Sequence, residues 1–242
     1  MEKRNLPEKL TRIIEEFSRE LETIYKDDMV SLILYGSGAN GEFMDKHSNL
    51  NLLVILKDTK LDKLTPAADL INKPKFRIIQ PLFFSKEYIY SSTDVFPIEF
   101  LDMRENYKVL KGEDVLKDIV IDTKNLRFQC EHELKAKLIN LRQSYLKMNR
   151  DKALLKHLLL KFFTSIIHIL RNVIRIKGRT PDYSKQNLIK QIAEDFPINT
   201  DTWNMILRLK NKEVTPDNEK IKQLFISFAG DLEKIVDIVD KS

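Results

Sequence analysis

The sequence predicts an α+β protein in which a small mixed-sheet domain is followed by an all-α helical bundle. Two observations lead to this fold class. Short apolar runs of strand length, bounded by turn residues, occur between about residues 30 and 101. Beyond about residue 120, apolar residues recur at helical spacing in long segments. We therefore expect two domains, over residues 1–115 and 120–242.

The first domain is expected to alternate helices and strands. Apolar residues recur every three or four positions from 6 to 26, which is typical of an amphipathic helix, and Pro7 suits its first turn. Apolar runs predict the strands, and short helices are expected over 62–70 and after Ser85. The predicted strands are 30–36, 50–57, 76–84 and 95–101. This order suits a small mixed sheet with helices on one face.

The second domain is expected to be a bundle. The predicted helices are 124–149, 151–177, 185–195, 199–211 and 217–239. Asp151 stands where an N-cap belongs, and Gly178 follows the second helix as a C-terminal glycine does. That second helix is apolar nearly all round. Its charged residues, among them Lys156 and Arg171, favour the core of a bundle over a membrane span.

Charge and cysteine content point to a cytoplasmic protein without a membrane partner. The single cysteine, Cys130, excludes an intramolecular disulfide and suits a reducing compartment. Residues 1–10 are charged and lack the apolar stretch of a signal peptide. Residues 1–110 carry a net charge of −2 and the remainder +7. The basic half could contact nucleic acid or another phosphate, or it could be a solvated helix surface.

The most informative stretch covers residues 30–56. An apolar run ends at Gly36 and Ser37, and a second run begins at Leu50, between Asn49 and Asn51. Residues i and i+2 of a strand point to the same face, so positions 49 and 51 direct two side chains at one spot. Gly36 permits a sharp turn, and Ser37 with the backbone amides after it could hold a phosphate.

This layout resembles the signature of the polymerase-beta superfamily of nucleotidyltransferases. There a strand ends in Gly-Ser, and a later strand carries two aspartates, one residue apart, that hold Mg²⁺ ions acting on a nucleoside triphosphate. The whole architecture is similar to antibiotic adenylyltransferases and to two-component nucleotidyltransferase/HEPN systems. The resemblance implies Gly36, Ser37, Asn49 and Asn51 as nucleotide-binding positions, with Mg²⁺ and a nucleoside triphosphate as cofactors. The alternative is an ordinary strand–turn–strand unit.

Both aspartate positions are asparagine in this chain. Asparagine keeps the shape but loses the charge, and Mg²⁺ prefers carboxylate and phosphate oxygens. We therefore expect poor metal binding and a degenerate nucleotidyltransferase that binds a nucleotide or a protein partner with little or no transfer. One alternative is an active Mg²⁺-dependent nucleotidyltransferase that adenylylates a small molecule or a protein. The other is a non-enzymatic interaction protein.

The superfamily adds a third carboxylate on a neighbouring strand, and Glu99 is the candidate for it. Glu99 lies within the apolar run predicted as strand 95–101, where a charged group needs a reason. It would be the surviving catalytic residue and metal ligand, or else it pairs with a lysine or lies at an exposed edge. Asp102 is the second candidate, although its odd offset puts it on the opposite face.

Other candidates lie outside this motif. His47, in the expected site loop, could contact a phosphate or base, or be solvated. Glu131 or Glu133 could supply a general base by analogy with antibiotic adenylyltransferases, or could complement the helix dipole. The histidines lack the spacing of a zinc site. The Arg–His pair of HEPN nucleases is also missing from the sequence, so ribonuclease activity is not expected.

Overall fold

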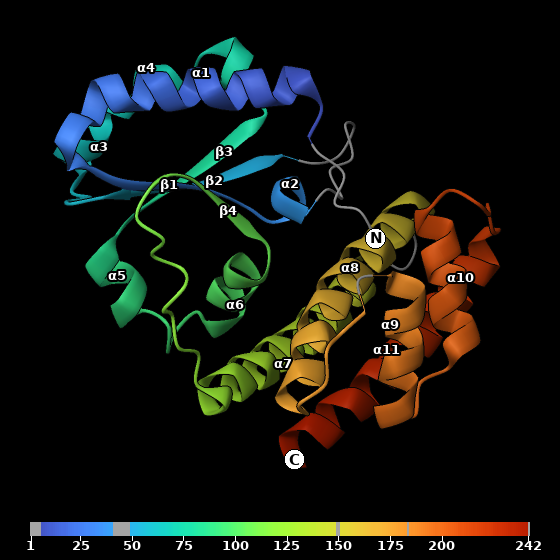
Figure 1. Cartoon of the computed structure of the whole chain (residues 1–242). Helices are drawn as coiled ribbons and strands as arrows, with labels where there is room; N and C mark the ends of the chain where they lie inside the picture. The colour runs from blue at the N-terminus through green and yellow to red at the C-terminus, as the bar shows by residue number, and fades with distance from the viewer. Residues whose placement is uncertain (1–5, 41–48, 149–150, 183, 242) are drawn as a thin grey trace. The chain divides into compact units, whose positions relative to one another are not determined.

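A computed structural model describes residues 6–40, 49–148, 151–182 and 184–241 of the chain. The chain divides into two compact units, Met1–Asp122 and Thr123–Ser242 (Figure 1). The first unit contains a small mixed sheet with helices. The described residues of the second unit form helices and the turns between them. These features confirm the predicted α+β fold class.

The first unit is built on a four-stranded sheet. Its strands are β1 (Met29–Tyr35), β2 (Leu50–Leu56), β3 (Ile79–Ser85) and β4 (Tyr107–Gly112). Their order in the sheet is β3-β2-β1-β4. β1 is antiparallel to both β2 and β4, whereas β2 is parallel to β3. From Leu52 to Leu56 the inner strand β2 is buried on both faces, which explains why this part of its sequence is a continuous apolar run.

Helices cover both faces of this sheet (Figure 1), so the expectation of helices on one face is wrong. On one face, Ile14 and Phe17 of α1 pack in one cluster with Leu32 and Leu52 of the sheet. The elements of this layer are α1 (Glu8–Tyr25), α3 (Leu61–Leu64), η2 (Thr65–Ala67), α4 (Ala68–Ile71) and η3 (Pro74–Phe76). On the other face lie α5 (Lys86–Ser91) and α6 (Pro97–Glu105).

Residues 95–101, predicted as a strand, are the clearest error of the sequence prediction. From Pro97 onward they belong to α6, and Pro97 occupies the start of that helix, where its missing N–H costs no hydrogen bond. The helix buries Phe100 and Met103 in the cluster below the sheet. The run is apolar because this helix faces the core.

The fourth strand is instead β4, which the sequence pattern did not reveal. It lies at the edge of the sheet and pairs with β1. Lys108 and Lys111 are exposed on it, and such lysines are typical of edge strands because they discourage pairing with other chains. They also interrupt the apolar pattern from which a strand would be predicted.

The second unit is a bundle around α8. Its helices are α7 (Thr123–Met148), α8 (Lys152–Ile176), α9 (Lys185–Asp195), α10 (Thr200–Lys210) and α11 (Asn218–Lys241). The predicted helix bounds are correct to within two residues. Asp151 caps α8 by accepting hydrogen bonds from the backbone N–H groups of Ala153 and Leu154, each at 3.1 Å. By length and composition α8 could cross a membrane, but half of its apolar window is buried, and it packs against the four other helices.

Candidate functional site

The site predicted from residues 30–56 begins at the sharp turn after β1. Gly36 has φ of 72°, the left-handed conformation that favours glycine. Its N–H donates a 2.8 Å hydrogen bond to the carbonyl oxygen of Asn106, the residue before β4. The next residue, Ser37, is the first of the short helix α2 (Ser37–Asn40). The turn is therefore tied to the start of the neighbouring edge strand.

β2 places Asn51 beside this turn. Asn51 pairs with Tyr35, the last residue of β1. A Cβ atom added to Gly36 would lie 3.2 Å from the Nδ2 atom of Asn51. The carboxamide of Asn51 thus lies against the turn, and the structure brings together two of the predicted site residues.

Asn49 lies exposed just before β2. If the alternation of β2 extends back by one residue, the Asn49 side chain points to the same face as that of Asn51, two residues later. The same alternation continues through Leu53 and Ile55, which pack in one cluster with Phe100 of α6. Asn51 therefore belongs to the face of the sheet that α5 and α6 cover, opposite to α1.

The strand register adds Gln80, which was not predicted as a site residue. Gln80 of β3 pairs with Asn51 in the parallel ladder. Its side chain is on the same face as that of Asn51, because Leu82 and Phe84 further along β3 join the cluster below the sheet. The sequence signal that could have revealed Gln80 is its polar side chain within an apolar strand, directly after Ile79.

A row of four side chains therefore crosses the sheet at this end: Gln80, Asn51, Tyr35 and Tyr107, one from each strand. We call it the carboxamide row. The hydroxyl group of Tyr107 donates a 3.1 Å hydrogen bond to a carboxylate oxygen of Asp114. Burial raises the pKa of Tyr35, and burial followed by the Asp114 hydrogen bond raises the pKa of Tyr107. Both tyrosines are thus protonated at neutral pH, and the row itself carries no formal charge.

The structure places Glu99 away from this row. Glu99 is exposed in the first turn of α6, whereas Asn106, which bonds to the Gly36 turn, follows the last turn of that helix. The premise that Glu99 lies on a neighbouring strand is therefore wrong, and Asp102 belongs to the same helix. A catalytic or metal-binding role for Glu99 stays a prediction, but the strand position on which it was based is not present.

The side chains of the carboxamide row do not fit a divalent cation. Mg²⁺ is usually held by one or two carboxylates together with substrate phosphates, and this row offers carboxamide and hydroxyl groups. Within the ranges that the structure describes, no group of three or more His, Cys, Asp or Glu side chains could hold a metal ion. His47 lies outside the described residues.

The acidic candidates of the bundle make contacts within α7. Glu131 forms a 2.8 Å ion pair with Lys135. Glu133 accepts a 3.0 Å hydrogen bond from Gln129. These contacts are those of helix-surface side chains at i,i+4 spacing, and a general-base role for either residue stays a prediction.

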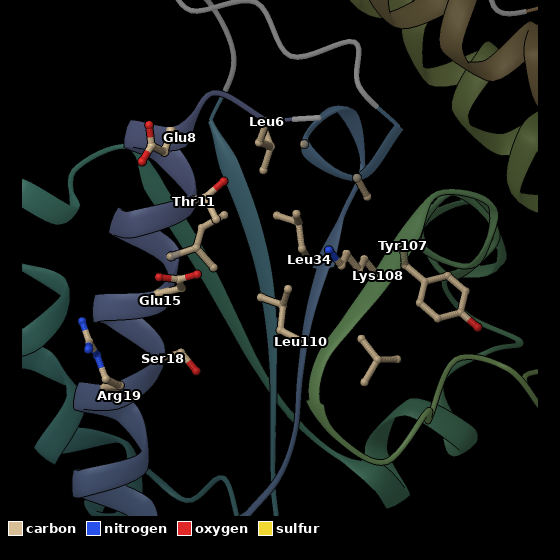
Figure 2. Close-up of a pocket in the computed structure, with 14 residues that line it drawn as sticks. Leu6, Glu8, Thr11, Glu15, Ser18, Arg19, Leu34, Tyr107, Lys108 and Leu110 are labelled. Atoms are coloured by element: carbon tan, nitrogen blue, oxygen red, sulfur yellow. The ribbon is translucent and has the colours of Figure 1, made fainter. Parts of the chain in front are cut away.

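A cavity of about 1050 Å³ lies between α1 and β4. Figure 2 shows Glu15 and Arg19 of α1 on one side of it, with Lys108 and Leu110 of β4 on the other. Leu34, which belongs to the cluster under α1, also lines it. Gly38 and Ala39 of α2 and Tyr107 of the carboxamide row also line this cavity, so it extends to the region of the Gly36 turn. Its lining mixes acidic, basic and apolar side chains and indicates no particular ligand charge.

Comparison with known proteins gives the family context. No protein-family model matches the chain. A protein of Methanocaldococcus jannaschii, provisionally named a protein adenylyltransferase, is 29% identical over 104 residues, which cover 41% of this chain and 96% of that protein. The crystal structure of a spectinomycin adenyltransferase from Enterococcus faecialis with ATP and spectinomycin matches with a TM-score of 0.60 and 12% identity, covering 93% of this chain and 99% of that chain. This chain therefore has the fold of that spectinomycin adenyltransferase, and 41% of it is similar in sequence to the Methanocaldococcus jannaschii protein.

Proposed function

We propose that this protein binds a nucleotide at the Gly36 turn and transfers it poorly or not at all. The observation that carries the proposal is the Asn51 carboxamide beside that turn, and strand alternation predicts that the Asn49 carboxamide is directed at the same spot. Nucleotidyl transfer depends on positioning and on stabilising the charge that develops on phosphate oxygens. Two metal ions usually supply that stabilisation, and uncharged side chains at these two positions hold metal ions poorly.

The similar proteins suggest which nucleotide to test first. Both are named for adenylyl transfer, and the enterococcal one was crystallised with ATP. Gly36 retains the tight turn that lets a ligand approach the backbone. ATP is therefore the probe of choice.

The single cysteine in 242 residues supports a reducing, cytoplasmic location.

An active Mg²⁺-dependent nucleotidyltransferase is the second candidate, favoured by the names of the similar proteins. The two candidates share a site and differ in chemistry. A transfer assay separates them: labelled ATP and Mg²⁺ are incubated with the full chain and with small-molecule and protein acceptors. We expect no label transfer above background. Transfer by the wild-type protein, lost on Asn51→Ala, would establish the active enzyme instead.

Restoring the carboxylates tests the site itself. The double variant Asn49→Asp/Asn51→Asp should gain Mg²⁺-dependent ATP affinity of roughly tenfold or more, because Mg²⁺ prefers carboxylate ligands. Isothermal titration calorimetry with and without Mg²⁺ measures the gain. Asn72→Asp is the matched control, because Asn72 is exposed after α4, in the layer on the other face of the sheet. A double variant that responds to Mg²⁺ no more than this control would show that positions 49 and 51 are not a metal site.

A further inference from the structure

We propose that the carboxamide row binds the phosphate groups of a nucleotide directly, without a divalent cation, through hydrogen bonds donated by Asn51 and Gln80. This inference rests on the proposed function, that a nucleotide occupies the site. It goes further by naming the metal-free nucleotide as the ligand and Gln80 as part of its binding site.

The chemistry of the side chains leads to this inference. An ionised carboxylate only accepts hydrogen bonds, whereas a carboxamide also carries two N–H donors. Phosphate oxygens are acceptors, so a carboxylate beside them needs a cation in between. A carboxamide can donate to them without one. Carboxylates on neighbouring strands would suit a cation, whereas the carboxamides at these positions suit an anion.

The geometry places these donors within reach of one ligand. Asn51 and Gln80 are register partners on neighbouring parallel strands and share a face. Neighbouring strands lie about 5 Å apart, so a single phosphate group can accept hydrogen bonds from both side chains. The Nδ2 atom of Asn51 lies next to Gly36, which has no side chain to cover it.

The rest of the row also favours a ligand without metal. Tyr35 is the register partner of Asn51 on the other side and is half-buried. Its hydroxyl is a neutral group that can donate a hydrogen bond. A Mg²⁺ ion bound to ATP would gain no carboxylate from this row and would occupy phosphate oxygens that the carboxamides could otherwise contact. Mg²⁺ should therefore leave ATP binding unchanged or weaken it.

Calorimetric titration of ATP into the full-length protein tests this, once with EDTA and once with excess Mg²⁺. We expect the Kd in EDTA to be equal to or lower than the Kd in Mg²⁺. Adenosine, which lacks phosphate, should bind more than tenfold more weakly than ATP. Asn51→Asp and Gln80→Glu, which keep side-chain size but replace donors by a negative charge, should each weaken metal-free binding by about tenfold. Asn72→Asp should change it by less than twofold.

The outcomes distinguish this inference from the proposed function. ATP binding that requires Mg²⁺ overturns the inference and leaves the proposed function standing. Adenosine binding as tightly as ATP also overturns it, because the phosphate groups would then contribute nothing. No nucleotide binding under either condition overturns both. The wild-type comparison between EDTA and Mg²⁺ requires no variant, so a variant that fails to fold does not weaken the test.

Discussion

Gly36 is the residue on which the geometry of the candidate site most depends. Its positive φ disfavours any side chain, and a Cβ there would lie within 3.2 Å of the Asn51 carboxamide. We predict that Gly36→Ala costs about 1–2 kcal/mol of stability from backbone strain and also weakens ATP binding by displacing Asn51. Urea unfolding followed by circular dichroism measures the first effect, and calorimetry measures the second.

Gly178 provides the matched control for this substitution. It has nearly the same φ, 73°, but nothing lies within 4 Å of the position where a Cβ would be added. Gly178→Ala should therefore cost a similar strain energy and leave ATP affinity unchanged. Equal loss of ATP affinity in both variants would mean that strain, and not the contact with Asn51, caused the effect.

The site residues differ in how far the sequence could reveal them. Gly36 directly follows β1 and Asn51 lies in β2, the next strand along the chain, so a local pattern was enough to place them together. Gln80 became visible only from the register of β2 and β3, because a parallel pair needs a long crossover whose alignment no local pattern fixes. Glu99 was misplaced because a helix facing the core and a buried strand have similar apolar composition over so few residues.

At the scale of elements, a buried carboxylate joins two helices of the bundle. Asp231 of α11 is 3% exposed. One of its oxygens accepts hydrogen bonds from the backbone N–H of Asn199, at 2.7 Å, and from Nε1 of Trp203, at 3.1 Å. Asn199 is the N-cap of α10, so this contact fixes the start of α10 against α11.

We predict that Asp231→Ala destabilises the second unit by about 3 kcal/mol, because two buried donors would lose their acceptor. Asp231→Asn should cost less, since its carbonyl oxygen can still accept. Trp203 is the single tryptophan of the chain, so its fluorescence during urea unfolding reports directly on this contact. Equal stability of wild type and Asp231→Ala would show that solvent replaces these bonds at no cost.

The elements that the sequence predicted best are the long helices of the bundle. Each has apolar residues at helical spacing over several turns, and α8 also carries a clear N-cap at Asp151. β4 was missed because an edge strand needs little apolar sequence. α6 was mistaken for a strand although Pro97, at the start of the helix, disfavours a position inside a sheet. Pairing with β1 decided β4, whereas α6 carried a local signal in Pro97 that the apolar composition of the run obscured.

For the whole molecule, we propose that the two compact units are separate domains close to the predicted ranges 1–115 and 120–242. Each unit has its own core: the sheet packs against α1 on one face and α6 on the other, and the bundle helices pack around α8. Fragments 1–122 and 123–242 should therefore fold separately. Each should show a cooperative thermal transition by circular dichroism, and Trp203 fluorescence should report on the second fragment.

The same two fragments test whether the first unit alone contains the nucleotide site. Every residue of the carboxamide row, together with Gly36, belongs to the first unit. If these residues supply the main contacts to phosphate, fragment 1–122 should bind metal-free ATP within about threefold of the full chain, and fragment 123–242 should not bind it. The second unit carries the basic surplus of the chain. If that positive charge also attracts the phosphate groups, the first fragment, which lacks it, should bind ATP more weakly than the full chain. A loss of more than tenfold that grows as salt is lowered would assign part of the site to the bundle, because salt screens attraction between a basic surface and phosphate.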